Sequence, residues 1–218
     1  RTAAGARAEL GGTITVSAPP AFAAARLVAP LAALRQRHPG LEIRLVGESR
    51  SAALDKREAD IAIRLSRPEQ GEFTIPRLGT MAFRLYASPA YLAERGTPLH
   101  PADLASHDCV SGKLLSTPDG WSFRIGKVIR PFPIRRRLAA TTAEAAIEAA
   151  IAGAGLARAL HYQVAEAEKE GRLVTVLGRF EPDPTPLSLI HSSARLVPLK
   201  LRAFLDFAGP RLKQRLAD

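Results

Sequence analysis

Short segments in which apolar and polar residues alternate recur along this chain, and stretches with the 3.6-residue spacing of a helix separate them. The first two alternating segments, residues 13–16 and 41–46, predict strands. Residues 22–38 between them predict a long helix, and Pro30 should bend it or delay its start, because proline cannot donate the helical hydrogen bond. A strand, a helix and a strand in this order form a βαβ unit, so the two strands are expected to be parallel.

The same alternation of strands and helices continues to the end of the chain and predicts an α/β fold. Further strands are expected at residues 60–64, 83–87, 109–110, 121–125, 134–139, 156–160, 173–177 and 187–191. Further helices are expected at residues 49–58, 89–95, 142–152, 162–170 and 198–216. The proline-rich segments 131–133 and 181–186 are expected to be a turn and a linker.

The chain is expected to cross twice between two Rossmann-like lobes. Residues 12–83 together with 188–218 form the first lobe in this prediction, and residues 84–187 form the second. Two crossings leave a cleft between the lobes. Ligands of open α/β sheets bind beyond the carboxyl ends of the strands, so this interlobe cleft is the expected binding site.

Composition is that of an ordinary globular protein with a strong positive charge. Of 218 residues, 46% are hydrophobic and 24% are charged, and the formal net charge is +10. The basic residues are scattered, and their one dense run, Arg135–Arg137, has no interleaved aromatic residues to stack on bases. Direct nucleic-acid binding by this chain is therefore an alternative that the sequence does not favour. No segment approaches the ~20 apolar residues of a membrane helix, and residues 1–12 do not resemble a signal peptide.

Motifs of enzyme chemistry are missing from the sequence. It has no G-x-S-x-G elbow and no P-loop, and Gly153-Ala154-Gly155 lacks the third small residue of a dinucleotide fingerprint. The adjacent residues His107, Asp108 and Cys109 cannot readily wrap one metal ion, so we interpret them as structural. We expect no catalytic residue, no metal and no cofactor.

Binding residues are expected where strands end and helices begin, because free backbone N–H groups and hydroxyl side chains gather there. An arginine at such a place can hold a carboxylate in a bidentate pair, so the ligand is expected to be small and anionic. Ser17 and Thr142 could instead cap helices, and Arg64 could form an internal salt bridge. The candidate ligand-binding residues are Ser17, Ala18, Pro19, Ser49, Arg50, Ser51, Arg64, Ser66, Ser111, Gly112, Thr141 and Thr142.

Many short segments, in the expected order, resemble the effector-binding domain of LysR-type transcriptional regulators. The string ASPAYL at residues 87–92 is the most characteristic of them. Three local departures from the family pattern occur: His191 and Ser192 stand where Tyr-Pro is frequent, Gly153-Ala154-Gly155 is a small variation, and His161 stands where a small residue is common. The other similar segments are 12–19, 31–45, 59–64, 96–98, 103–104, 107–109, 121–123, 152–157, 162–164, 171–174 and 202–207.

This resemblance implies a periplasmic-binding-protein-like fold of type II and a small-molecule effector in the cleft. It also implies a cytoplasmic protein that is not an enzyme and that forms dimers, and tetramers in the full-length regulator. The family pairs subunits through the first long helix and the second strand, which assigns Leu27, Leu31 and Leu34 to a dimer interface, to the core, or to both. DNA binding would belong to an N-terminal winged-helix domain that is not expected within this chain.

Two other classes remain as alternatives. A periplasmic solute-binding protein would share the two-lobed clamp, and an α/β enzyme acting on a small acid would share the strand-end site. The sequence does not identify the effector.

Overall fold

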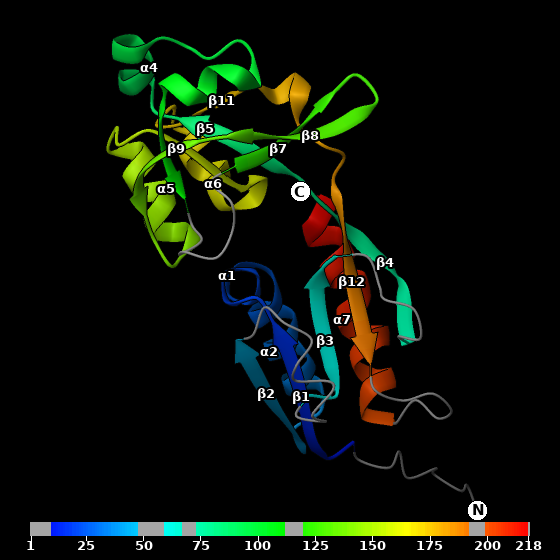
Figure 1. Ribbon diagram of the computed structural model, residues 1–218. Coiled ribbons are helices and arrows are strands. Elements are labelled where there is room, and N and C mark those ends of the chain that lie inside the picture. Colours follow the sequence, from blue (N-terminus) through cyan, green and yellow to red (C-terminus); the bar gives the residue numbers. More distant parts are fainter. Residues whose placement is uncertain (1–9, 48–58, 67–72, 112–119, 192–198, 218) are drawn as a thin grey trace, which may run out of the picture. The chain divides into compact units, whose positions relative to one another are not determined.

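The computed structural model describes residues 10–47, 59–66, 73–111, 120–191 and 199–217. The chain divides into two compact units, which are described separately (Figure 1). The first unit comprises Arg1–Thr80 and Thr185–Asp218, and the second comprises Met81–Pro184. The expected lobe boundaries lie a few residues from these divisions. The helix expected at residues 49–58 lies outside the described residues.

A five-stranded mixed sheet forms the centre of the first unit, in the order β2-β1-β3-β12-β4. Strand β1 pairs in parallel with β2 and β3, and β12 runs antiparallel to β3. The expected parallel pairing of the first two strands is therefore confirmed. The strands are β1 Gly12–Ala18, β2 Leu41–Gly47, β3 Ile61–Leu65, β4 Phe73–Met81 and β12 Thr185–His191.

The first long helix is divided, although the sequence predicts one helix with a bend or a late start at Pro30. It consists of α1 Pro20–Phe22, the π-helical turn η1 Ala23–Leu27 and α2 Val28–Arg37. Pro30 has no N–H for the carbonyl one turn earlier, and the wide turn lies directly before it. The irregularity that the proline predicts is thus present, but as a π turn that begins earlier.

Two long helices of the first unit pack against one another and bury the apolar stripe of the first. Helix α7 Leu199–Ala217 contacts α2, η1 and β1. Leu27 and Leu34 of the first helical stretch and Phe204 of α7 are fully buried. Leu31 is also buried, so the three predicted dimer-interface leucines pack within the core of their own unit.

The second unit is built on another five-stranded sheet, in the order β11-β5-β10-β6-β9, with a separate two-stranded hairpin of β7 and β8. Strand β6 is parallel to β9 and β10, whereas β5 is antiparallel to β10 and β11. The strands are β5 Phe83–Ala87, β6 Asp108–Ser111, β7 Gly120–Ile125, β8 Val128–Pro133, β9 Arg135–Ala139, β10 Leu156–Leu160 and β11 Val174–Val176. The helices are α4 Pro89–Arg95, η2 Pro101–Ser106, α5 Ala143–Ile151, α6 His161–Lys169 and η3 Gly178–Phe180.

Both faces of this second sheet carry a hydrophobic core, because successive residues of a strand point to opposite faces. Leu85 and Cys109 belong to the core shared with α4, η2 and the hairpin. Their strand neighbours Tyr86 and Val110 belong to the other core, which α5 and α6 cover. Helices on both faces of a mixed sheet give the expected α/β architecture.

Two strands were not predicted from the sequence, and both contain proline. Residues 131–133 were expected to be a turn but form part of β8, whose only partner in the described residues is β7. Strand β4, which contains Pro76, lies at the edge of the first sheet. Proline is tolerated in such strands, because an edge strand need not donate every N–H to a neighbour.

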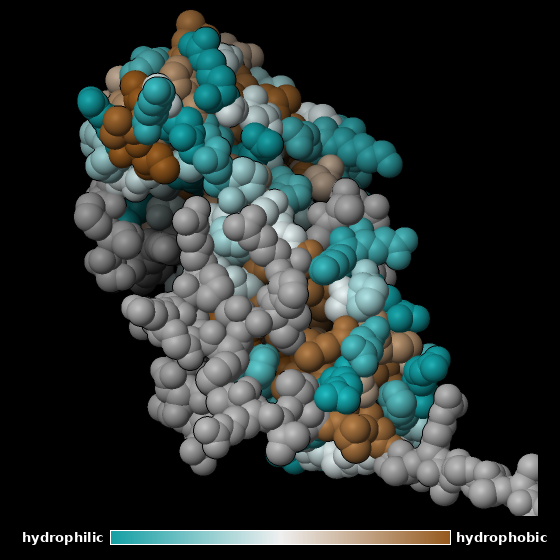
Figure 2. Space-filling view, turned by 90° about the vertical axis from the view of Figure 1, so that its right-hand side faces the viewer, coloured by the Kyte–Doolittle hydropathy of each residue, from teal (hydrophilic) through white to brown (hydrophobic). Residues whose placement is uncertain are grey.

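Large apolar side chains that remain exposed are dispersed over several elements. Leu199 is 69% exposed at the start of α7, and Val28 is 49% exposed at the start of α2. On the face that Figure 2 shows, hydrophilic side chains are interspersed with apolar ones. Within the described residues, no helix has both the length and the apolar character needed to span a membrane.

Gly155, directly before β10, permits a close approach between two backbone segments. Its φ is +142°, and a Cβ atom there would lie 2.3 Å from the carbonyl oxygen of Asp108. We expect Gly155→Ala to lower the free energy of unfolding by about 3 kcal/mol or more, because strain and overpacking add. Chemical denaturation measures the effect.

Gly171→Ala is the matched control for this prediction. Gly171 also has a positive φ, +71°, but nothing lies within 4 Å of its added Cβ. Its cost should be about 1 kcal/mol from backbone strain alone. Equal losses of stability for the two variants would contradict the close-approach explanation.

Candidate functional site

Two parallel strands of the first unit end side by side, and predicted binding residues lie at their ends. Val16 and Ser17 of β1 stand opposite Ile61 and Ala62 of β3. Ser17 is only 2% exposed, and the chain turns at Pro19 into α1. No side chain caps α1, so Ser17 does not cap that helix.

Arg64 and Ser66 follow at the carboxyl end of β3, next to a serine that the sequence did not single out. Ser188 of β12 stands opposite Arg64, and its hydroxyl donates to the carbonyl oxygen of Ser66 at 2.6 Å. Ser188 is buried, as is Ser17. Since β12 is antiparallel to β3, its beginning lies at the same edge as the end of β3. The sequence did not reveal this antiparallel pairing, and for that reason Ser188 was not predicted to lie near Arg64 and Ser66.

In the second unit, the parallel strands β6 and β9 end together at residues 111 and 139. The carbonyl oxygen of Ser111 accepts a hydrogen bond from Ala140 N at 2.9 Å. Directly beyond lie Thr141 and Thr142, both exposed. Thr142 is the N-cap of α5, and its Oγ1 accepts from Ala145 N at 3.2 Å. The capping role is confirmed, whereas a ligand role for Thr142 stays a prediction.

His161 forms two hydrogen bonds with Ala82, which lies at the start of the second unit. It begins α6, and its backbone N–H donates to the carbonyl oxygen of Ala82 at 3.0 Å. Its ring Nδ1 accepts from the N–H of Ala82 at 3.4 Å. The departure from the family pattern at this position therefore has a structural role: a small residue could not hold Ala82 from the side chain.

Four of the predicted binding residues, Ser49, Arg50, Ser51 and Gly112, lie outside the described residues. The other eight fall into two groups, each within one unit. One group lies at the carboxyl ends of β1 and β3 in the first sheet: Ser17, Ala18, Pro19, Arg64 and Ser66. The other group lies at the carboxyl ends of β6 and β9 in the second sheet: Ser111, Thr141 and Thr142.

Two arginines of the run Arg135–Arg137 in β9 lie close to the carboxylate of Asp108. Strand β9 is at the edge of its sheet, and Arg135 lies 3.1 Å from a carboxylate oxygen of Asp108. Arg137 and Arg95 approach the same carboxylate at 4.0 and 3.9 Å. The run thus places charge on an exposed strand edge, which discourages edge-to-edge pairing with another sheet.

The string His107, Asp108 and Cys109 is used for packing and hydrogen bonds. His107 Nδ1 and Asp108 N both contact the hydroxyl of Tyr91, at 3.0 and 2.9 Å. Burial raises the pKa of the Cys109 thiol to about 12, so it stays protonated. Among the residues that the structure describes, no group of three His, Cys, Asp or Glu side chains is arranged to hold a metal ion.

Stability should fall as the pH drops below about 6.5, because burial lowers the pKa of His107 in the folded chain. A depressed histidine pKa means that the unfolded chain binds more protons, so stability is lost from the unfolded pKa downwards. One such group contributes at most about 1.4 kcal/mol per pH unit. His107→Gln should flatten the melting temperature between pH 6.5 and 5 relative to the unmodified chain. Parallel curves for the two proteins would contradict this role.

Comparison with known proteins gives a consistent result. The family model described as the LysR substrate binding domain matches residues 7–213. The HTH-type transcriptional regulator CrgA of Neisseria meningitidis serogroup B is 30% identical over 192 residues, which cover 87% of this chain and 64% of CrgA. The uncharacterized HTH-type transcriptional regulator YhjC of Escherichia coli K12 is 29% identical over 95% of this chain and 70% of YhjC. The chain therefore spans about two thirds of the length of these relatives.

Solved structures agree with the sequence comparison. The regulatory domain of CrgA from Neisseria meningitidis superimposes with a TM-score of 0.78 at 28% identity, covering 93% of this chain and all of that domain (100%). Full-length AphB from Vibrio cholerae, described as a virulence activator of the LTTR family, superimposes with a TM-score of 0.79. At 23% identity over 92% of this chain and 68% of AphB, that likeness shows the fold alone.

Proposed function

The chain belongs to the LysR family through its substrate binding domain, and we propose that it senses a small anionic effector for a transcriptional regulator. Its fold is the two-lobed, type II periplasmic-binding-like α/β fold of LysR regulatory domains. Its relatives with assigned names are transcriptional regulators, and no enzyme family is indicated. We therefore favour a cytoplasmic regulator over a periplasmic solute-binding protein and over an enzyme of a small acid.

One observation carries the proposal: each unit ends its parallel strands at an edge that offers hydroxyl groups. In the first unit these come from Ser17 of β1 and from Ser66, which follows β3, and Arg64 stands two residues before Ser66 in the chain. In the second unit they come from Ser111 and Thr141, next to the N-terminus of α5. The arginine and the helix N-terminus both favour an anionic group.

The proposed mechanism is a shift between an open and a closed arrangement of the two units. A ligand that contacts both edges binds the closed arrangement more tightly, and its differential affinity sets the size of the shift. Closure would change how subunits pack and hence how attached DNA-binding domains are spaced. DNA contact is assigned to a winged-helix domain outside this chain.

A panel of small carboxylates and their neutral amides tests the ligand class by thermal unfolding. At 100 times its dissociation constant, a bound carboxylate should add about 2.7 kcal/mol, or roughly 5–10 °C for a chain of this size. Arg64→Gln should remove most of this shift. Arg130→Gln, which changes an exposed arginine of β8, is the matched control. Failure of all the carboxylates, or equal shifts from the amides, would contradict an anionic effector.

We also propose that the chain pairs with a second copy through the exposed side of the first helical stretch. The predicted interface leucines are buried, so other side chains must supply the contact. Val28 is half exposed, and small apolar residues on the same side of the helix are exposed with it: Ala24, Ala25, Ala29 and Ala32. Leu45 is exposed on the neighbouring edge strand β2.

Val28→Glu should raise the dimer dissociation constant at least tenfold, because it would bury a carboxylate in an apolar contact. Sedimentation velocity over a range of concentrations measures this. Ala165→Glu, on the exposed side of α6, is the control and should leave the dimer unchanged. An unaltered dimer in the Val28 variant would exclude this side of the helix.

A further inference from the structure

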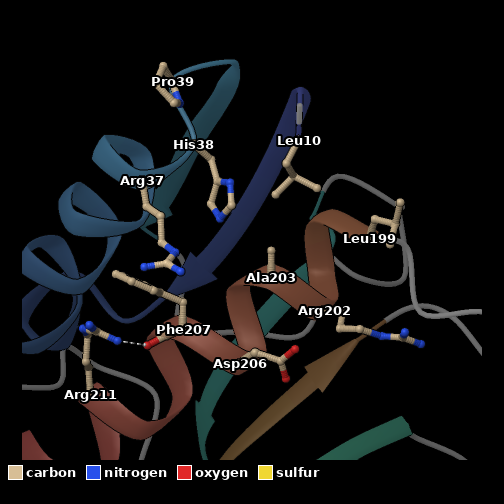
Figure 3. Close-up of a pocket in the computed structure, with 10 residues that line it drawn as sticks. All are labelled: Leu10, Arg37, His38, Pro39, Leu199, Arg202, Ala203, Asp206, Phe207 and Arg211. Carbon is tan, nitrogen blue, oxygen red and sulfur yellow. Dashed lines mark hydrogen bonds between the residues drawn. The ribbon is translucent and has the colours of Figure 1, made fainter. Parts of the chain in front are cut away.

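A hollow of about 810 Å³ lies within the first unit, between the end of α2 and the first turns of α7 (Figure 3). This volume is within the roughly 300–1,000 Å³ of small-molecule sites. The hollow shares no lining residue with the strand-end site described above.

One end of the hollow is basic. Arg211 stacks on the ring of Phe207, with its guanidinium carbon 3.7 Å from the ring centre, and its Nη1 donates to the Phe207 carbonyl at 2.9 Å. Arg37 of α2 approaches the same ring from the other helix, at 5.9 Å. The aromatic ring thus holds two guanidinium groups at one end of the hollow (Figure 3).

This positive charge has little compensation nearby. Within the described part of the chain, neither Arg37 nor Arg211 forms an ion pair with a carboxylate. Among the described residues, Asp206 is the single acidic residue that lines the hollow, and Arg202 extends away at its rim (Figure 3). An anion placed at the basic end would be attracted by both guanidinium groups and would accept hydrogen bonds from the nearer one.

The other end of the hollow is apolar. Ala203 forms its floor, and its short side chain leaves room between Leu10 and Leu199 (Figure 3). Leu199 is 69% exposed, so an apolar group that covered it would remove apolar surface from water. His38 lies between the two ends (Figure 3).

We propose that this hollow is a second ligand site, which takes a carboxylate with an apolar tail. The carboxylate binds at Arg37 and Arg211, and the tail lies over Ala203 against the two leucines. The chain segment before Leu10 is a poor match in charge, because residues 1–9 contain two arginines and one glutamate. The proposal is independent of the effector site, since it uses different residues.

Titration of the 218-residue chain with octanoate, followed by amide chemical shifts in NMR, tests the proposal. Saturable shifts are expected at Ala203 and Phe207. Two further probes separate the contributions: 1-octanol lacks the charge and butyrate lacks the tail, and each should bind at least tenfold more weakly. No saturable shift at these residues, or equal binding of octanol, would overturn the proposal.

Variants then assign the site. Arg37→Gln combined with Arg211→Gln should weaken octanoate binding at least tenfold, whereas Lys213→Gln, an exposed cation of α7 outside the hollow, should not. Ala203→Leu keeps all the charges but fills the floor, and it should abolish binding. Undiminished affinity in either the double variant or Ala203→Leu would contradict the assignment.

Discussion

Parallel strand pairing is the constraint on which the rest of this structure depends. Parallel neighbours must end at the same edge of a sheet, and the connections between them must return as helices or long crossovers. Strands β1, β2 and β3 obey this in the first unit, and β6, β9 and β10 obey it in the second. Residues that are far apart in the sequence, such as Ser17 and Arg64 or Ser111 and Thr141, are brought to one edge for this reason alone.

Several of the basic residues stabilise local structure. Asp108 is approached by three arginines, and Arg158 pairs with the buried Glu181 at 2.5 Å while it stacks on Phe123. Burial raises the pKa of Glu181 although Arg158 opposes this, so the pair is costly to separate. The guanidinium groups beside Phe207 differ, because they gather without a carboxylate partner in the described residues. This uncompensated positive charge is the reason to propose an anionic ligand for the hollow.

The sequence predicted most of the elements because their signals are local. Short, largely apolar segments identified β5 and β10 with their observed bounds, and the capping threonine at residue 142 marked the start of α5. The failures were non-local. Prolines suggested a turn at residues 131–133, and only the pairing partner makes that segment a strand. Likewise, the helical stripe of Leu27, Leu31 and Leu34 identified an apolar face, but whether α7 or a second subunit covers it cannot be read from spacing.

The candidate site shows the same limit. Strand ends could be located from the sequence, and five predicted binding residues lie at strand ends of the first unit and three at those of the second. Their binding of a ligand stays a prediction. Ser188 and the contact of His161 with Ala82 depend on antiparallel neighbours, and they escaped prediction. The sequence also does not show which of these hydroxyl side chains are buried. Ser17 is 2% exposed, whereas Thr141 and Thr142 are exposed.

We propose that one ligand engages the strand ends of both units. Residue-resolved NMR titration of the chain with the carboxylate that gives the largest thermal shift tests it most directly. Such a ligand should give saturable shifts at Ser17 and Arg64 in the first unit and at Ser111 and Thr141 in the second, all fitting one dissociation constant. Shifts confined to one unit, or two unrelated dissociation constants for the two edges, would contradict it.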